Sequence, residues 1–389
     1  MSYISQYGRH QLDAEDKDAV LRVLDSDFLT QGHTVREFES GICEAVGSKY
    51  AIACANGTAA LHLVMLGLGI KESDLVWTTP ITFVASANAA RYVGATIDLV
   101  DINARTWNLC PLKLEEKLEK TKNQGGQLPA AVILVHFAGS PADTRKIKQL
   151  SEAYGFRIVE DASHALGAHT TTENIGECKY SDACTFSFHP VKNITTGEGG
   201  AITTNSEQLW RNLSILRTHG IEKPTQAESR LLEEPWLYKQ TQLGLNYRMC
   251  DIQAALGLSQ IRKLGKFTKT RTSLAEEYRR QLTQNSSITF QDLSNNSSAH
   301  HLMVIRVPED MRLSLFKHLK ANEIGVQVHY IPIYRHPFYE TQFSRNDFPN
   351  SELYYSQALS LPLHCNLTKP EVGKISQIVQ EHLKRCVIQ

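Results

Sequence analysis

A lysine and an aspartate each follow an apolar run of this 389-residue chain, in places that suit cofactor chemistry. Lys192 lies between the apolar run 183–187 and a glycine-rich turn at 197–200. Asp161 directly follows the run 157–160. A lysine amine can form a Schiff base with pyridoxal phosphate, and a carboxylate can hold that cofactor's protonated pyridine nitrogen. The two residues therefore predict a pyridoxal phosphate site.

Each of these residues also has an ordinary structural explanation. Most lysines are solvated at the surface, and Asp161 could cap the helix that follows it. The glycines after Lys192 favour the cofactor interpretation, because they permit close backbone approach. A lysine held away from water also loses its proton more readily, as Schiff-base formation requires. His164 could bind the ring hydroxyl or could be a hydrogen-bonded core histidine.

Two further motifs suit the phosphate and the ring of such a cofactor. Asn-Gly-Thr at 56–58 follows a predicted strand and opens a predicted helix, whose free amides attract a phosphate. The hydroxyl groups of Thr58 and Ser187 can add hydrogen bonds. Phe83 follows another strand and can stack on a flat pyridine ring. A capped glycine turn and a core phenylalanine are the structural alternatives.

Strands and helices that alternate along the first two-thirds of the chain must position these residues. Strands such as 131–137 are almost continuous in apolar residues, which is typical of strands covered on both faces. The alternation predicts an α/β domain with a largely parallel sheet, whose ligands gather at the carboxyl ends of strands. The predicted strands are Ala51–Cys54, Leu75–Thr78, Ala95–Val100, Ala131–Phe137, Arg157–Glu160, Ala183–Ser187 and Ala201–Thr204. The predicted helices are Thr58–Leu68, Ala85–Tyr92, Leu112–Thr121 and Thr144–Ala153.

An interruption in the alternation of strands and helices separates the first part of the chain from a second part. Residues 222–242 are charged and contain two prolines, so we expect a long excursion loop. We expect a large cofactor-binding α/β domain with an N-terminal arm at 1–255, and a smaller α+β domain at 256–389. The elements predicted after the break are helices Asp251–Leu264 and Lys266–Leu282, the polar loop Asn285–Ser298, and strands His301–Val307 and Gln327–Tyr330.

The composition excludes several classes of protein. Apolar residues make up 42% and charged residues 21%, and 41 basic side chains balance 41 acidic ones. Without an excess of positive charge, neither nucleic acid nor a membrane surface is an expected partner. The eight cysteines are scattered and form no CxxC pair, so we expect reduced thiols and no metal site. No signal peptide or apolar span is recognisable, so we expect a cytoplasmic protein.

Taken together in their order along the chain, the motifs resemble a known family. They are similar to the pyridoxal-phosphate-dependent nucleotide-sugar aminotransferases of the DegT/DnrJ/EryC/StrS type. The resemblance covers nearly the whole chain and implies a fold-type I, aspartate aminotransferase-like structure. The motifs that carry it are Leu29–Gly32, Asn56–Leu61, Thr79–Ala85, Glu160–Gly167, Ser187–Lys192 and Asn246–Gly257.

The resemblance implies a role for each cofactor residue. Lys192 would form the Schiff base and carry the transferred proton, while Asp161 binds the pyridine nitrogen. His164 takes the place of a residue, often Gln, beside the ring oxygen, and Phe83 stacks on the ring.

The remaining cofactor contacts concern the phosphate. Gly57, Thr58, Ala59 and Ser187 would hold it from the same chain. Asn246 would reach it from a partner subunit, which implies a homodimer with shared active sites.

A finer resemblance concerns the substrates. Residues 163–167, 328–334 and 360–364 resemble the subgroup that transfers an amino group from L-glutamate to C4 of a UDP-linked 4-keto-6-deoxy-N-acetylhexosamine, in the pseudaminic acid pathway. The substrate contacts implied by this likeness are Tyr7, Asp27, Phe28, Leu29, Thr30, Gln327, Val328, His329 and Tyr330.

Three other functions fit parts of the pattern. One is an aminotransferase for a different nucleotide keto-sugar, aminated at C3 or C4 and linked to UDP or dTDP. Another is a sugar dehydratase of the same fold. Lys192 is evidence against this function, because such relatives carry histidine at that position. The third is a non-catalytic regulator that binds the cofactor or a sugar nucleotide.

Overall fold

A seven-stranded sheet is the centre of the computed structural model, which describes residues 5–222, 234, 236–294 and 296–388. Its strands are β1 (Tyr50–Cys54), β2 (Leu75–Thr78), β3 (Thr96–Leu99), β4 (Ala131–Val135), β5 (Arg157–Asp161), β6 (Ala183–Ser187) and β7 (Gly200–Thr204). Their order is β1-β7-β6-β5-β4-β2-β3. Neighbours from β6 to β3 pair in parallel, whereas β7 is antiparallel to both β6 and β1. The sheet is therefore mixed but mostly parallel, as predicted.

Helices cover both faces of this sheet because successive strand residues point to opposite sides. In β5, Val159 belongs to the apolar core that contains residues of α3 and α4. Its neighbour Ile158 belongs to the core formed with α5 and α6. The helices around the sheet are α2 (Thr34–Val46), α3 (Gly57–Gly67), α4 (Val84–Tyr92), α5 (Pro111–Asn123), α6 (Thr144–Tyr154) and α7 (Glu207–Leu216).

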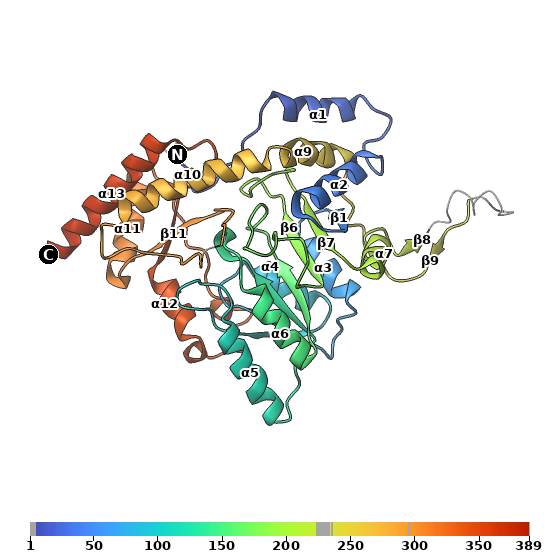
Figure 1. Cartoon of the computed structure of the whole chain (residues 1–389), viewed down its shortest axis with the longest axis horizontal. Helices are drawn as coiled ribbons and strands as arrows, with labels where there is room; N and C mark the ends of the chain where they lie inside the picture. The colour runs from blue at the N-terminus through green and yellow to red at the C-terminus, as the bar shows by residue number, and fades with distance from the viewer. Residues whose placement is uncertain (1–4, 223–233, 235, 295, 389) are drawn as a thin grey trace.

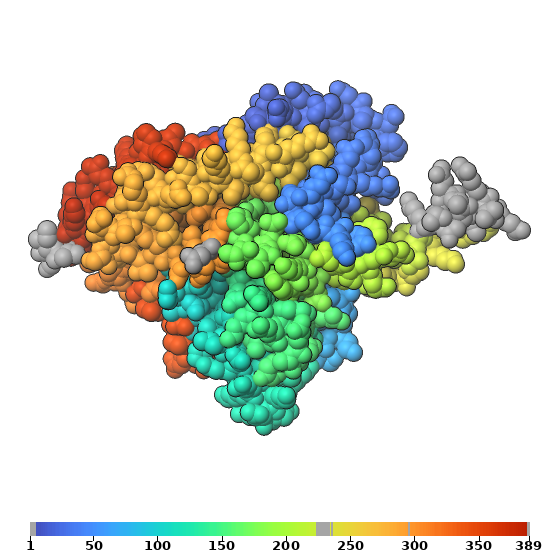
Figure 2. Space-filling view, viewed as in Figure 1, coloured from blue at the N-terminus to red at the C-terminus, as the bar shows by residue number. Residues whose placement is uncertain are grey.

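The N-terminal helix α1 (Ala14–Leu24) lies along α9 (Asp251–Ile261) on one edge of the molecule (Figures 1 and 2). A buried carboxylate links them. Asp16 accepts hydrogen bonds from Ser259 Oγ at 2.7 Å and Gln260 Nε2 at 2.8 Å, and it pairs with Lys263 Nζ at 2.7 Å. Because a buried charge is costly without partners, these contacts fix the arm to the body.

The C-terminal part combines helices with a small antiparallel sheet, which agrees with the predicted α+β region. The sheet order is β10-β11-β12. Its apolar core is formed by residues such as Leu274, Leu315 and Val379. The elements are α10 (Leu264–Leu282), β10 (Thr289–Phe290), β11 (Met303–Arg306), α11 (Glu309–Ala321), α12 (Pro349–Gln357), β12 (Ala358–Leu361) and α13 (Lys369–Ile388), with 3-10 turns at Ile333–Arg335 and Arg345–Asp347. The boundary proposed after residue 255 lies within α9 and stays a prediction.

Two expectations about local structure need correction. The segment Gln327–Tyr330 is not a strand, because it forms a single bridge, between Gln327 and Ser360. The strand predicted to end at Phe137 ends at Val135, since the chain turns into a short 3-10 helix at 137–139.

The predicted excursion loop is described only at its two ends. There β8 (Ile221–Glu222) and β9 (Lys239–Gln240) pair in antiparallel fashion and project from the body (Figure 1). Residues 223–233 and 235 lie outside the described residues. Across the described chain, no helix is long and apolar enough to cross a membrane.

Candidate active site

A cavity of about 1160 Å³ lies at the carboxyl ends of β5 and β6, beside the first turn of α3. Its wall also includes the N-terminal arm and a segment that follows α11. It brings together residues that are far apart in the sequence. The predicted site residues that line it are Tyr7, Gly57, Thr58, Ala59, Phe83, Asp161, His164, Ser187, Lys192, Asn246, Gln327, Val328, His329 and Tyr330.

Lys192 supplies an amine to this cavity from the turn between β6 and β7. Its backbone N–H donates to the His189 carbonyl at 2.8 Å, which helps to fix the turn. Burial lowers the pKa of the Lys192 amine to about 8, against the opposing effect of the Asp161 carboxylate. Such an amine gives up its proton near neutral pH far more easily than a solvated lysine does.

Asp161 is a buried carboxylate whose two oxygens are both fixed by donors. Ser86 Oγ donates to Oδ2 at 2.6 Å. Ser163 donates to Oδ1 through its backbone N–H at 3.1 Å and its hydroxyl at 2.6 Å. Ser86 in turn lies 2.7 Å from Thr82 Oγ1. The carboxylate is thus held as an oriented acceptor that still lines the cavity.

The first turn of α3 provides a site for an anion. The Asn56 side chain caps the helix by accepting from the backbone N–H of Ala59 at 2.8 Å. The amides of Gly57 and Thr58 have no acceptor within the helix, because they precede its first complete turn. A Cβ atom at Gly57 would lie 2.8 Å from the Cβ of Ser187. Glycine therefore lets the helix start approach β6 closely, in the arrangement that a phosphate requires.

His164 lies beside Asp161 and is more constrained than its sequence position indicates. Its Nδ1 accepts a hydrogen bond from the Ala138 backbone N–H at 3.3 Å, and its Nε2 lies 3.0 Å from the Tyr330 hydroxyl. The ring of His301 lies 4.3 Å from that of His164, centroid to centroid. Burial and the nearby Lys192 lower the pKa of His164 well below its usual value, so the imidazole is neutral.

Phe83 presents an aromatic face to the cavity. The residue is 57% exposed although it lines a cavity, and its ring centroid lies 6.0 Å from that of Tyr330. An apolar ring left open in this way is well placed to stack on a flat ligand.

Four predicted substrate contacts lie away from the cavity of the single chain. Asp27, Phe28, Leu29 and Thr30 follow α1 and are all exposed. The carbonyl of Leu29 accepts from the Asp251 N–H at 2.9 Å, so this segment is joined to the start of α9. Their contact with a substrate stays a prediction.

The position of Asn246 also bears on the predicted assembly. Asn246 is exposed and lines the cavity of its own chain. That it acts on a phosphate from a partner subunit stays a prediction.

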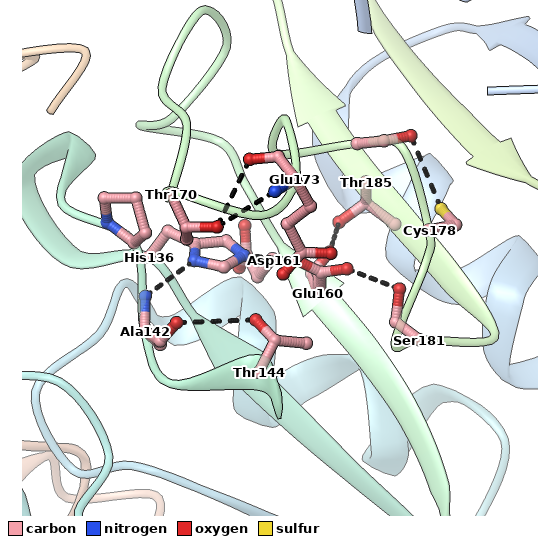
Figure 3. A network of polar contacts seen from close by, with 12 residues as sticks. His136, Ala142, Thr144, Glu160, Asp161, Thr170, Glu173, Cys178, Ser181 and Thr185 are labelled. Atoms are coloured by element: carbon pink, nitrogen blue, oxygen red, sulfur yellow. Dashed lines mark hydrogen bonds and ion pairs between the residues drawn. The ribbon is translucent and has the colours of Figure 1, made fainter. Parts of the chain in front are cut away.

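The neighbouring carboxylate Glu160 points to the opposite face of β5, because successive strand residues alternate in direction. There it joins a separate network of polar contacts (Figure 3). It accepts from the Ser181 hydroxyl and lies 2.7 Å from His136 Nε2. Because His136 Nδ1 accepts from the Ala142 N–H at 3.0 Å, Nε2 carries the proton donated to Glu160. This closed network anchors β5 below Asp161.

Several residues of the site were missed by sequence reasoning. Ser86 and Ser163, which orient Asp161, and His301, whose ring packs at a tilt against that of His164, were not singled out. Ser163 stands two residues after Asp161 and could have been found as a local hydroxyl donor. Ser86 and His301 come from distant parts of the chain, and only the fold brings them to the site.

The chemistry of these groups fits pyridoxal phosphate. An oriented buried carboxylate suits a protonated ring nitrogen, the α3 amides suit a phosphate, Phe83 suits the ring face, and Lys192 suits the aldehyde. No group of three or more histidine, cysteine or acidic residues within the described ranges is arranged to hold a metal ion. A mostly parallel sheet with such a site defines the class of fold-type I pyridoxal-phosphate-dependent transferases.

Comparison with known proteins narrows this class. Residues 10–380 match the model of the DegT/DnrJ/EryC1/StrS aminotransferase family. The chain is 37% identical over 363 residues to the UDP-4-amino-4,6-dideoxy-N-acetyl-beta-L-altrosamine transaminase of Campylobacter jejuni, covering 92% of each chain. It is 35% identical to a spore coat polysaccharide biosynthesis protein of Bacillus subtilis, covering 95% of each.

A solved structure agrees with these sequence matches. The aminotransferase PseC of Helicobacter pylori, involved in the biosynthesis of pseudaminic acid, superposes with a TM-score of 0.89 at 31% identity, covering 99% of this chain and all of that one. The protein belongs to the DegT/DnrJ/EryC1/StrS aminotransferase family. It is therefore a sugar aminotransferase, as its motifs predicted.

Proposed function

We propose that the protein uses pyridoxal 5'-phosphate to transfer the amino group of L-glutamate to C4 of UDP-2-acetamido-2,6-dideoxy-β-L-arabino-hexos-4-ulose. The products would be UDP-4-amino-4,6-dideoxy-N-acetyl-β-L-altrosamine and 2-oxoglutarate. We place this reaction in the cytoplasm, in a homodimer with shared active sites. The observation that carries the proposal is the convergence of Lys192, Asp161 and the α3 amides on one cavity.

The names of the relatives support the choice of sugar. The Campylobacter relative is named for this amino sugar, and the Helicobacter structure for the pseudaminic acid pathway. The Bacillus relative, of nearly equal identity, is named for spore coat polysaccharide biosynthesis, so a product assay is the experiment that distinguishes the sugars.

Pyridoxal phosphate, when bound, supplies an electron sink that stabilises a carbanion at the carbon losing its proton. Lys192 Nζ would take that proton and return it at the neighbouring carbon, for which a pKa of about 8 suits it near neutral pH. Asp161 would keep the ring nitrogen protonated, since its oxygens are already oriented by Ser86 and Ser163. Phe83 would exclude water from one face of the ring.

The α3 amides and Ser187 would bind the cofactor's phosphate, which leaves the rest of the cavity to the substrates. Residues 327–330 and Tyr7 line its other side and are the proposed contacts of the sugar. Since the whole chain has a formal net charge of zero, local amides and donors, not a general positive field, would hold the nucleotide diphosphate.

Product analysis with a panel of keto-sugars tests the proposal. The purified protein with pyridoxal phosphate and L-glutamate would be given UDP- and dTDP-linked sugars carrying a 3-keto or a 4-keto group. We expect amination of the UDP-linked 4-keto-6-deoxy-N-acetylhexosamine. Amination of a dTDP-linked 3-keto sugar alone would overturn the choice of substrate. Binding of the sugar nucleotide without any turnover would instead indicate a non-catalytic regulator.

A further inference from the structure

We propose that the Tyr330 hydroxyl donates a hydrogen bond into the cavity, to an oxygen of the molecule bound beside Lys192, and that His164 is the positioning residue that aims it. The inference deepens the proposed function and rests on it, because it concerns the same bound cofactor and substrate. It changes the role expected of His164. The sequence predicts that His164 binds the ring oxygen, but its Nε2 is already within hydrogen-bond distance of the Tyr330 hydroxyl.

The direction of the hydrogen bonds follows from the backbone. The Ala138 N–H can only donate, so His164 Nδ1 is an acceptor and carries no proton. A neutral imidazole has one N–H, which must then lie on Nε2. Nε2 donates to the Tyr330 oxygen at 3.0 Å. The hydroxyl hydrogen of Tyr330 must therefore point elsewhere, and Tyr330 lines the cavity.

Packing holds the imidazole in this orientation. The ring of His164 is nearly parallel to that of Tyr330, at 20° and 5.9 Å between centroids. The His301 ring packs against that of His164 with a tilt of 35° at 4.3 Å, and Phe137 meets it edge-on at 6.2 Å. His301 is itself 4% exposed. With neighbours packed around it, the His164 ring has little freedom to turn its Nε2 away from Tyr330.

Burial and nearby charges keep both the His164 imidazole and the Tyr330 hydroxyl neutral. Burial lowers the pKa values of His164 and His301 well below the usual histidine value, and neighbouring positive charge adds to the effect. Burial, Tyr7 and Asp161 raise the pKa of Tyr330 above its ordinary range. Tyr330 therefore keeps its hydrogen and acts as a donor, not as a negative charge competing with Asp161.

The chemistry of the acceptor is an electron-rich oxygen close to Lys192. Two sources provide one: the ring hydroxyl of the bound cofactor, and an oxygen of the bound substrate. Both gain from a donor that is fixed before the ligand arrives, because no reorganisation is then required.

The test compares four variants of the full-length protein loaded with pyridoxal phosphate. Tyr330→Phe removes the donor, and His164→Ala removes the group that aims it. His164→Gln keeps an amide that can accept from the Ala138 N–H and donate to Tyr330. Tyr278→Phe is the matched control, because that buried hydroxyl in the C-terminal core has no partner within the described chain.

The first measurement is the pH midpoint of the change in visible absorbance of the bound cofactor, without any substrate. If the ring oxygen is the acceptor, removing the Tyr330 donor raises the proton affinity of that oxygen, because its negative charge is no longer stabilised by a hydrogen bond. The bound cofactor then loses its proton at a higher pH. We expect the midpoint to rise by about 1 pH unit in Tyr330→Phe and His164→Ala. His164→Gln should recover most of the wild-type value, and Tyr278→Phe should match wild type.

The second measurement tests whether the acceptor is an oxygen of the substrate and not of the cofactor. If the acceptor is a substrate oxygen, the midpoint stays unchanged, while kcat for the keto-sugar falls about tenfold in Tyr330→Phe and His164→Ala and recovers in His164→Gln. If Tyr330→Phe behaves as Tyr278→Phe does in both measurements, the donor role is refuted. If Tyr330→Phe has an effect and His164→Ala has none, the positioning role is refuted.

Failure of the proposed function looks different from failure of this inference. A wild-type protein that shows no cofactor absorbance, or one that binds the cofactor but aminates no keto-sugar, counts against the proposed function. The absorbance titration requires no sugar, so it reports on Tyr330 and His164 even if the chosen sugar is wrong.

Discussion

Glu160 and Asp161 are adjacent in sequence and both buried, at 1% and 6% exposure, yet they lie on opposite faces of β5 and do different work. Glu160 contacts His136 and Ser181 in a polar network (Figure 3), and none of these three residues lines the cavity. Asp161 is oriented by Ser86 and Ser163 and lines the cavity. Burial alone therefore does not mark a functional carboxylate.

What distinguishes the two carboxylates is the region they face. The Glu160 face packs against the core that contains α5 and α6, and there Glu160 is paired with His136 and Ser181. The Asp161 face meets α3, α4 and the turn with Lys192, where space remains for a ligand. One carboxylate stabilises the fold and the other is available for chemistry.

The largest effect is expected at Lys192. Lys192→Ala removes the amine that would carry the transferred proton, so turnover with L-glutamate should fall below detection. The fold should persist, because burial of this ammonium does not stabilise the protein. Steady-state kinetics and circular dichroism measure the two properties. Retained turnover would show that another base does the proton transfer.

The next effect is expected at Asp161. Asp161→Asn keeps the shape of the side chain, and its amide oxygen can still accept from Ser163, while the Ser86 hydroxyl must turn to accept from the new NH2 group. The charge that would hold a protonated ring nitrogen is lost. We expect kcat to fall by at least about 100-fold with little change in thermal stability. A loss of stability without a loss of kcat would reverse the assigned roles of the two β5 carboxylates.

Glu160→Gln should show the opposite pattern. A glutamine offers one acceptor oxygen in place of two, so the Nε2–H of His136 and the Ser181 hydroxyl can no longer both donate to residue 160. We expect a loss of about 1–3 kcal/mol in the free energy of unfolding and at most a severalfold loss in kcat. Chemical denaturation of the wild type and the variant gives the difference. An unchanged midpoint would mean that the network does not anchor β5.

The smallest effect on turnover, namely none, is expected at Glu173, which lies near Glu160 in the same region (Figure 3). Burial and the nearby Glu160 raise its pKa from 4.5 to about 8. The folded state therefore binds this proton more tightly than the unfolded state, and stability should fall as pH rises from about 4.5 to 8. In Glu173→Gln, the part of this stability decrease that comes from the Glu173 carboxyl should be absent. Unfolding curves across that range provide the comparison, and identical pH profiles would contradict it.

The sequence allowed the chemistry of the site to be predicted more fully than its supporting contacts. Lys192, Asp161 and the 56–58 turn carry local patterns, since each follows an apolar strand that the fold places at one edge of the sheet. Ser86 could not be predicted, because its bond to Asp161 spans 75 positions. Likewise, the segment 327–330 has strand-like composition but finds only one bridge partner, which depends on the fold around it.

The central claim is that Lys192 is the amine that binds the cofactor, and chemical trapping tests it most directly. The protein loaded with pyridoxal phosphate would be reduced with borohydride, digested, and its peptides mapped by mass spectrometry. We predict that the pyridoxyl group is found on the peptide that contains Lys192. A pyridoxyl group on any other lysine, with Lys192 unmodified, would contradict the assignment of this cavity as the active site.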